Sequence, residues 1–454
     1  MADRATLEKL ATRRLIHIPA PNPVFIAGEP GTWDENFVEC CNVIKDGETY
    51  YLYYHGHARD EEKWPGANYR LGVASSPHPL GPWTRHDGNP IIDHGPEGSW
   101  EDDWVACAAV LKEEKDRYYM WYSGNFSVGL ATASHPLGPW EKHPDNPIIP
   151  HDFGYVGGVV KVDGRYYMFN EYPRGKVHPS PDQGPMSVAT ADRPEGPWEL
   201  YDGNPALMHD DWGSWEDGGY SEAGLLYHDG IFHTFYGGTK WEKLESIGYA
   251  CSLDGFNFVK HVDNPVAPRE RNPDATGFAE VHAVYEKPFY YLFHTLRYQS
   301  RTGFETWAED IGVQILATQT PFRLPLPALA LSSLGAGEIS ALDNPLTEDG
   351  RTRSMTGCPP ISLEAATSCS ITVECAYAEM ATAGLRVHVL SSLDGIACDT
   401  EPYSTFDLPL RPGERVRATH SLDASVMFVR VQVENLDKKE AVGDVKVTAV
   451  VGAG

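Results

Sequence analysis

The segment SSPHPLGPWTRHDGNPII, residues 75–92, recurs along the chain in related form. The other copies are ASHPLGPWEKHPDNPII (133–149), ADRPEGPWELYDGNPAL (191–207) and SLDGFNFVKHVDNPV (252–266), and a shorter NPVF begins at Asn22. Every copy carries Asn-Pro followed by apolar residues, and successive asparagines lie 67, 57, 58 and 60 residues apart. A period of this size indicates that one supersecondary unit is repeated around the fold.

An aromatic run accompanies each copy: ETYYLYYHG, DRYYMWYSG, GRYYMFNEY, GIFHTFYGG and PFYYLFHTL. Runs rich in Tyr and Phe that are broken by Asp-Gly or Gly-Pro-Trp turns are typical of short antiparallel strands. We therefore predict an all-β fold whose first part, residues 1–324, is a five-bladed β-propeller and the catalytic domain. The NPVF segment is expected to supply the missing outer strand of the last blade, which closes the ring.

The repeat ends near Phe322, and an extended connector, LPLPALALSSLG, follows it. Later segments such as GLRVHVLSSLDG and FVRVQVENL alternate apolar and polar residues between turns. This alternation predicts a C-terminal β-sandwich at residues 335–454. Because no constellation of acids or histidines marks it as catalytic, we expect an accessory module for packing, carbohydrate binding or assembly into a homo-oligomer.

Composition narrows the classes of partner. The 454 residues carry 37 Lys and Arg against 64 Asp and Glu, a formal net charge of −27. This charge repels phosphate backbones and anionic lipid heads, so we expect neither a nucleic-acid nor a membrane partner. No apolar run is long enough for a secretory signal or a membrane span, which favours a cytoplasmic location. The eight cysteines show no CxxC spacing, so buried thiols are expected.

A second repeat combines Gly, Trp and acids: GTWDENFVEC (31–40), GSWEDDWVAC (98–107) and GSWEDGGYSE (213–222). Each copy lies just before the innermost strand of a predicted blade. A repeated Trp indicates packing between blades, and the neighbouring acids are expected to cap turns. Function is then expected where the copies differ.

Three glutamates occupy the same place in different units. Glu39, Glu222 and Glu280 each stand seven residues before the Asp-Gly turn, or its equivalent, that follows the predicted inner strand. The third unit has Val156 there. Since inner strands of a propeller converge on one funnel, these carboxyl groups are expected to meet. Like charges held close separate the pKa values of carboxyl groups into a proton donor and an ionised base, which glycoside cleavage requires.

The segment SEAGLLYHDGIFHTFYGG (221–238) resembles the acid-bearing segment of family 43 glycoside hydrolases and their five-bladed relatives. HAVYEKPFYYLFH (282–294) is similar to the last blade of that group, and WVACAAVLKEEKDRYYMWYSG (104–124) is similar to its second blade. The resemblance spans roughly residues 22–322. The missing acid in the third unit suggests a distant family of the same architecture.

The resemblance implies that Glu222 is the general acid and that Glu39 is the base. The base of that group is normally an Asp, so Asp34 and Glu35 remain alternatives to Glu39. A third carboxylate would orient the substrate and tune the acid. Asp103 or Asp152 is the candidate for that role.

Sugar contacts require stacking faces and polar side chains that form several hydrogen bonds. The candidates are those near the ends of predicted inner strands: Trp104, Tyr155, Trp241, His55, His57, Glu280, His282 and Arg297. In the resembling group an inner His of the last blade often lies beside a bound ion, so a structural metal near His282 is the one expected ion. No cofactor is expected for the reaction.

These observations predict a hydrolase for short oligosaccharides that is exo-acting and inverting. One alternative is a phosphorylase on the same fold, which would bind phosphate through cations such as Arg297, Lys240, His282 and Arg59. Another is a propeller that binds sugars without cleaving them.

Overall fold

The computed structural model describes residues 3–20, 22–59, 62–64, 68–114, 116–150, 153–171, 184–240, 244–269, 277–298, 308–342, 357–395 and 397–454. In these ranges the only α-helix is α1 (Arg4–Ala11), which begins at Asp3, whose carboxylate accepts a hydrogen bond from the Thr6 amide. A membrane-crossing helix, long and apolar over its length, is not found in this part of the chain. The eight cysteines are free thiols.

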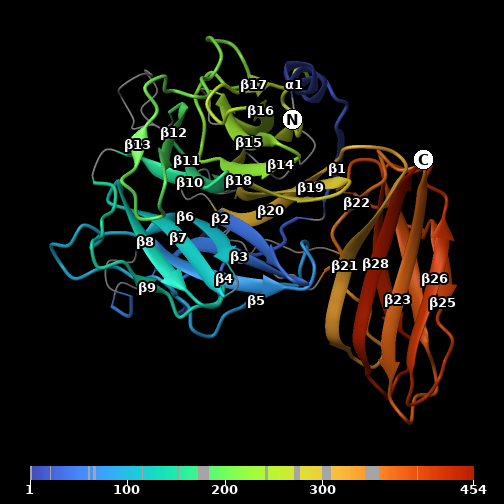
Figure 1. The fold of residues 1–454 in the computed structure, drawn as a ribbon. Coiled ribbons are helices and arrows are strands. Elements are labelled where there is room, and N and C mark those ends of the chain that lie inside the picture. Colours follow the sequence, from blue (N-terminus) through green and yellow to red (C-terminus); the bar gives the residue numbers. More distant parts are fainter. Residues whose placement is uncertain are drawn as a thin grey trace. The chain divides into compact units, whose positions relative to one another are not determined.

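Four sheets have the same design: four antiparallel strands paired in sequence order (Figure 1). The first sheet consists of β2 (Phe37–Asp46), β3 (Thr49–His57), β4 (Arg70–Ser76) and β5 (Thr84–Arg85). The second consists of β6 (Ala106–Glu114), β7 (Arg117–Gly124), β8 (Ser127–Ala133) and β9 (Glu141–Lys142). The third consists of β10 (Tyr155–Val162), β11 (Arg165–Glu171), β12 (Met186–Ala191) and β13 (Glu199–Leu200). The fourth consists of β14 (Gly224–His228), β15 (Ile231–Lys240), β16 (Leu244–Ser252) and β17 (Val259–Lys260).

The fifth sheet joins distant parts of the sequence. Its order is β18 (Gly277–Glu286), β19 (Phe289–Tyr298), β20 (Ala308–Ala317) and β1 (Ile16–Pro19). The N-terminal strand is thus IHIP, which precedes the NPVF segment expected there. Phe25 of NPVF instead forms an isolated bridge with Ile311, as Ile92 does with Leu71 in the first sheet. NPVF therefore repeats the role of the other Asn-Pro segments.

The C-terminal strands form two further sheets. The sixth has the order β21 (Phe322–Leu334), β28 (Val442–Ala453), β23 (Ser368–Tyr377) and β26 (Arg415–Leu422). The seventh has the order β22 (Ile361–Ser362), β27 (Phe428–Asn435), β24 (Leu385–Ser392) and β25 (Ser404–Asp407). The chain forms two compact units, Met1–Leu15 with Pro23–Pro79 and Trp83–Gln314, and Ile16–Asn22 with Leu80–Pro82 and Ile315–Gly454.

Each of the first five sheets packs on the next. Buried apolar side chains form shared cores between the first and second sheets, the second and third, and the third and fourth. The amide of Val281 on β18 donates to the carbonyl of Glu222, which joins the fifth sheet to the fourth. The amide of Cys40 on β2 donates to the Thr295 hydroxyl on β19 at 2.9 Å, which joins the first sheet to the fifth.

The repeated asparagines explain why the Asn-Pro copies recur. Each uses its side-chain amide to accept from the backbone N–H and donate to the backbone C=O of one residue in its neighbouring strand, at 2.9–3.1 Å. The pairs are Asn89 with Val73, Asn146 with Leu130, Asn204 with Val188 and Asn264 with Tyr249. The side chain thereby gives a partner to the backbone N–H, and it shares the carbonyl with a backbone N–H of the segment at the outermost strand.

The Trp-acid copies also have a structural role. Trp33, Trp100 and Trp215 lie with ring centroids 5.5–6.0 Å from a buried Tyr of their own sheet. The acid after each Trp pairs with a cation of the outermost strand, namely Asp34 with Arg85, Glu101 with Lys142 and Glu216 with Lys260. The acid that follows it in each copy accepts from the amide of the Gly that starts the segment; these acids are Glu35, Asp102 and Asp217. Both acids of each copy therefore tie the turn to the sheet.

Candidate active site

The three glutamates singled out by the sequence come from three sheets and are all buried. Glu39 lies on β2, Glu280 lies on β18, and Glu222 lies just before β14. Their exposed fractions are 7%, 5% and 9% respectively. The hydrogen bond from the Val281 amide to the Glu222 carbonyl, 3.1 Å long, makes Glu222 and Glu280 near neighbours. Glu280 interacts electrostatically with both Glu39 and Glu222, so the three carboxyl groups share one region.

Irregular strand pairing directs these side chains. The first strands of four sheets carry register shifts at this level: β2 after Cys40, β6 after Ala106, β10 after Val156 and β18 after Ala279. Extra residues in a strand bend it and change the direction of a side chain. Cys107 and Glu280 stand in two of these bulges with φ of 51° and 46°, a left-handed conformation that non-glycine residues seldom adopt.

Glu39 is held as an anion. Its Oε2 lies 2.5 Å from Nε2 of His55, and its Oε1 accepts a hydrogen bond from the Tyr69 hydroxyl at 3.0 Å. Burial would raise the pKa of Glu39, but His55, a hydrogen bond with Glu309 and the charge of Arg297 together hold that pKa below its usual range. Both oxygens of this carboxylate are therefore occupied.

His55 supports Glu39 from within the protein. It is 2% exposed, and its Nδ1 lies 3.0 Å from the Cys41 sulfur and 3.3 Å from the Cys107 amide nitrogen. Burial opposes a charge on this imidazole, but Cys41 and Glu39 outweigh it and raise the pKa of His55. His55 was expected to contact a sugar, but both of its ring nitrogens have protein partners.

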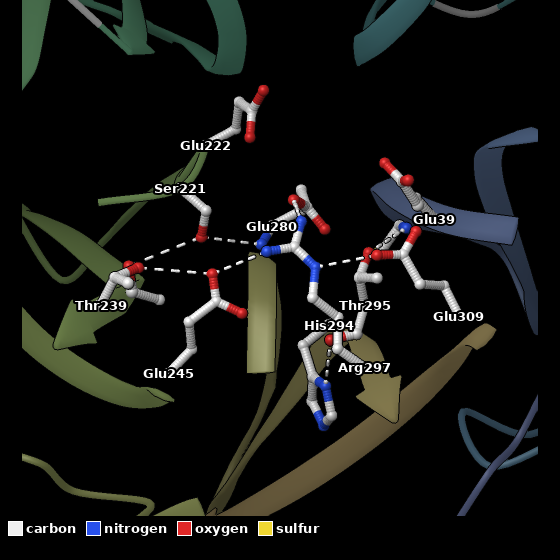
Figure 2. A network of polar contacts seen from close by, with 12 residues as sticks. Glu39, Ser221, Glu222, Thr239, Glu245, Glu280, His294, Thr295, Arg297 and Glu309 are labelled. Carbon is white, nitrogen blue, oxygen red and sulfur yellow. Dashed lines mark hydrogen bonds and ion pairs between the residues drawn. The ribbon is translucent and has the colours of Figure 1, made fainter. Parts of the chain in front are cut away.

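Arg297 on β19 joins three carboxyl groups from three strands. Its Nη2 donates to Glu280 at 2.7 Å, its Nη1 to Glu245 at 2.7 Å and its Nε to Glu309 at 3.0 Å. Figure 2 shows Arg297 between Glu245 and Glu309, with the carboxyl groups of Glu222 and Glu39 above it in the view. Burial and the charge of Glu39 raise the pKa of Glu309, so that Glu309 carries a proton.

Glu280 differs from its neighbours. Burial is the largest effect on its pKa, and Glu39, Glu222 and Glu245 add to it, so the pKa of Glu280 rises to about 8 despite the ion pair with Arg297. Its Oε2 is buried and has no hydrogen-bond partner among the residues that the structure describes. Glu280 is thus a protonated carboxyl at neutral pH with one open oxygen.

Glu222 is less constrained than Glu39. Its Oε1 lies 3.4 Å from the Cys107 sulfur, and burial together with Glu222 raises the pKa of that thiol, which keeps it protonated as a weak donor. No ion pair of Glu222 occurs among the described residues. In Figure 2 its carboxyl group stands apart from the dashed contacts around Arg297. A buried carboxyl without a cationic partner is available for proton transfer.

His282 is a neutral imidazole. It is 3% exposed, its Nδ1 lies 3.4 Å from the Asn42 amide nitrogen, and burial lowers its pKa to about 3. A Cβ atom on Gly224 would lie 2.8 Å from that nitrogen, which explains a glycine two residues after Glu222. Groups of three or more His, Cys, Asp or Glu side chains that could hold a metal ion are not found in the described ranges. The structural metal near His282 stays a prediction.

Aromatic side chains gather at the ends of the second and third sheets. The Trp104 ring centroid lies 5.6 Å from that of Tyr155 and 5.5 Å from that of Phe126. Trp104 and Tyr155 are half-buried and Phe126 is 38% exposed, so the group presents apolar ring surface to solvent. Trp104 precedes Cys107, the contact of Glu222, by three residues. This places the ring group on the segment that leads into the acid site.

Other predicted site residues lie elsewhere. Asp103 is exposed and accepts a hydrogen bond from Asn68 at 3.3 Å, and it does not join the three glutamates. Asp34 pairs with Arg85 at 2.8 Å, and Glu35 accepts from the Gly31 amide, so both alternatives to Glu39 have structural partners. Trp241 and Asp152 lie outside the described residues.

Three members of the site were not predicted from the sequence: Tyr69, Glu245 and Glu309. Each lies two residues before a residue that forms a β-bridge with an Asn-Pro segment. These bridging residues are Leu71 after Tyr69, Ile247 after Glu245 and Ile311 after Glu309. The sequence does contain a matching pattern for the two glutamates: in LESIG (244–248) and AEDIG (308–312) a Glu stands two residues before Ile-Gly. Aligning the third strands of the repeat, and not the first strands alone, would have identified them.

Comparison with known proteins identifies the fold. No protein-family model and no curated protein sequence matches the chain. Among solved structures, one described as a glycoside hydrolase has a TM-score of 0.50 at 17% identity, over 69% of this chain and 96% of that one. A structure described as a complex of BT0996 and RGII has a TM-score of 0.50 at 18% identity, over 65% and 92%. A thermostable family-43 glycoside hydrolase has a TM-score of 0.46 at 16% identity, over 64% and 91%.

The chain therefore shares its fold with known glycoside hydrolases, as the resemblance in its sequence indicates. Identities of this size extend to the fold and not to the reaction. The reaction has to be argued from the site.

Proposed function

We propose that this protein is a glycoside hydrolase that cleaves neutral oligosaccharides with carboxyl groups of Glu222, Glu39 and Glu280. The observation that carries this proposal is the meeting of three buried glutamates from three sheets, one of them held as an anion. Burying several carboxyl groups together costs free energy, so such a cluster is expected where function requires it. Glycoside cleavage requires one carboxyl that gives a proton and one that carries negative charge.

The architecture that we propose is a five-bladed β-propeller at residues 1–324 followed by a β-sandwich at 335–454. Support comes from the five sheets that pack each on the next and from the hydrogen bond that joins the fifth sheet to the first. The two C-terminal sheets would be the layers of the sandwich. In a propeller the first strand of each blade lies at the axis, which is where the three glutamates would meet.

In the proposed reaction Glu222 gives its proton to the departing glycosidic oxygen as the C–O bond breaks. Water adds to the anomeric carbon, and its proton passes to Glu39, the proposed base. We propose inversion and exo action, as the sequence analysis does. Proton NMR of the first product formed identifies its anomeric configuration, and a retained configuration would overturn inversion while leaving hydrolysis intact.

Hydrolysis is favoured over phosphorolysis because two of the cations expected to bind phosphate, Arg297 and His282, are not available for it. Arg297 donates to three carboxyl groups, and His282 is neutral. Arg59 is exposed and donates to Asn36. A phosphorylase needs positive charge at the reacting centre, whereas this centre is acidic. Cleavage should therefore proceed at the same rate with and without inorganic phosphate.

The test is a panel of aryl glycosides that includes pyranosides and furanosides, assayed with the whole protein. The variant Glu222→Gln should lower kcat about 10²- to 10⁴-fold, the usual contribution of general acid catalysis, and should retain sugar binding. Glu101→Gln is the matched control because Glu101 pairs with Lys142 and Tyr122 away from the three glutamates. A protein that binds sugars but cleaves none of the panel would support the non-catalytic alternative.

A further inference from the structure

Glu280 lies beside Glu222 and has one open carboxyl oxygen. Its Oε1 accepts from Arg297 at 2.7 Å, while its buried Oε2 has no hydrogen-bond partner in the described ranges. The residue is buried, with an exposed fraction of 5%. A buried polar atom without a partner costs free energy, and such an atom in a native protein has a reason such as a catalytic role or a bound water or ion.

The backbone gives a second indication. Glu280 has a left-handed φ of 46° inside the β18 bulge, between Ala279 and His282. Its own amide donates to the Ser221 hydroxyl at 3.0 Å, which holds this conformation in place. A strained conformation that is held by neighbouring groups is typical of functional positions. The bulge brings Glu280 beside Glu222, because the next residue, Val281, donates to the Glu222 carbonyl.

The charges around Arg297 set the state of Glu280. One guanidinium is shared by Glu245, Glu280 and Glu309, and the nearby Glu39 already pairs with His55. Glu309 already carries a proton, so an ionised Glu280 beside an ionised Glu245 would leave one uncompensated negative charge on this guanidinium in a buried site, which is costly. A proton on Glu280 removes that charge, in agreement with its pKa of about 8.

We propose that Glu280 binds the substrate as a neutral carboxyl, with Oε2–H donating a hydrogen bond to an oxygen of the sugar beside Glu222. The ligand is a hydroxyl or ether oxygen of an uncharged sugar, which accepts such a bond. A sugar carboxylate would add another negative charge to a site that has too few cations, so acidic sugars are excluded from this position. This inference rests on the proposed function for the identity of the ligand as a sugar.

The three glutamates then have different tasks. Glu39 is fixed by His55 and Tyr69, so it contributes negative charge and no donor. Glu222 exchanges the proton. Glu280 keeps its proton and orients the sugar, because an ionised Glu280 would present two acceptors to the sugar oxygen.

The pH dependence of binding tests this assignment. Glu280 is protonated below its pKa, so the hydrogen bond to the sugar is present below about pH 8 and is lost as the pH rises through that value. Wild-type KM should therefore rise about 3- to 10-fold above pH 8, the fold-change expected for one hydrogen bond. An unchanged KM up to pH 9 or above would overturn the proposal.

Three variants distinguish a neutral, hydrogen-bond-donating Glu280 from an anionic one. Glu280→Gln keeps an N–H donor at this position but cannot ionise, so the rise in KM above pH 8 should disappear. Glu280→Leu removes the donor, so KM at pH 6.5 should increase about 10-fold. Glu245→Gln is the matched control, because it changes another buried carboxyl on Arg297 and should keep a rise in KM with pH. The rise should begin at lower pH than in the wild type, since the charge of Glu245 helps to raise the pKa of Glu280. If Glu280 acts as an anion instead, Glu280→Gln should abolish activity, and this result also contradicts the proposal.

A binding measurement separates this proposal from the proposed function. Calorimetric titration of Glu222→Gln with the monosaccharide released by the wild type needs no turnover. If the wild type cleaves nothing, the same titration is made with neutral monosaccharides and uronic acids. In the Glu222→Gln variant the pKa of Glu280 is lower than in the wild type, because the Glu222 charge that helps to raise it is gone. Affinity for a neutral sugar that falls as the pH rises, and that is lower when Glu280→Leu is added, would support Glu280 even where hydrolysis has failed. Equal affinity for the uronic acids would overturn it even where hydrolysis is found.

Discussion

Nε2 of His55 lies 2.5 Å from Oε2 of Glu39, and both side chains are buried. The other ring nitrogen of His55 faces Cys41 and the Cys107 amide, so the imidazole has no freedom to turn toward a ligand. A buried carboxylate with an imidazolium beside it stays ionised to low pH. His55 is therefore the group that keeps negative charge in the acid site.

The variant His55→Gln should make the reaction sensitive to acid. The folded-state pKa of Glu39 is depressed, so wild-type Glu39 stays ionised as the pH falls below its ordinary value. Without the imidazolium, burial dominates and the pKa of Glu39 rises. The pH at which kcat/KM falls on the acid side should then move above about 5, which a pH–rate profile measures.

His57→Gln serves as the control for this profile, since the ring of His57 lies 2.7 Å from the Ala58 carbonyl and 3.4 Å from the Asn36 side-chain amide. Its acid-side profile should match that of the wild type. Identical profiles for His55→Gln and the wild type would mean that the charge of Glu39 has no part in the reaction.

Trp104→Ala should weaken substrate binding. The ring lies in an exposed aromatic group with Tyr155 and Phe126, which suits stacking on a sugar ring. Loss of one aromatic contact is worth ~0.5–1.5 kcal/mol, so KM should rise about 2- to 10-fold with little change in kcat. Steady-state kinetics test this, with the exposed Trp212→Ala as control. Equal KM for Trp104→Ala and wild type would remove Trp104 from the substrate contacts.

Arg297→Met should destabilise the first unit strongly. It leaves Glu245, Glu280 and Glu309 without their shared cation in a buried site. Removing one partner of a buried ion pair typically costs ~3–5 kcal/mol. Urea denaturation measures the loss. Arg386→Met, which breaks the exposed pair with Asp407, should cost no more than about 1 kcal/mol and is the control. Similar losses for both variants would contradict a structural role for Arg297.

Asn146→Ala tests the repeated asparagine. Its side chain makes two hydrogen bonds to the Leu130 backbone and donates to the Tyr122 hydroxyl. The variant leaves the buried N–H of Leu130 without this partner, although the Leu130 carbonyl keeps the His143 amide. This loss should cost ~1–3 kcal/mol and lower the melting temperature. Asn257→Ala, in an exposed turn with Asp254, is expected to have a smaller effect. A melting temperature equal to that of the wild type would show that the repeat is not maintained for stability.

Much of the fold could be predicted from the repeat. Asn89 and its copies bond to backbone groups within their own unit, and Trp33 stacks on Tyr54 of its own sheet. Interactions of this kind recur with the sequence period, so the pattern identified the sheets and the position of the three glutamates. The outer strand IHIP was missed because it lacks the aromatic run and pairs with β20, nearly 300 residues away.

The hydrogen-bond and ion-pair partners of the site residues could not be predicted from the repeat. Asp34 and Glu39 are both acids near one strand, yet one pairs with Arg85 and the other with His55. Arg297 looked available for a ligand, but three carboxyl groups from other strands surround it. Glu245 belongs to the fourth sheet and Arg297 to the fifth, and the sequence period carries no information about contacts between sheets. Within the first sheet, Arg85 and His55 lie on the different strands β5 and β3, and the sequence does not say which acid each one meets.

The amino-acid sequence by itself determined the antiparallel sheets and the level at which Glu39, Glu222 and Glu280 stand, because local turns and strand pairing follow from neighbouring residues. The tertiary structure alone decided that Glu39 is ionised and that Glu280 keeps a proton and has an open oxygen. Burial and the charges of side chains distant in sequence set the proton affinity of each group, and these act only after the sheets have packed together.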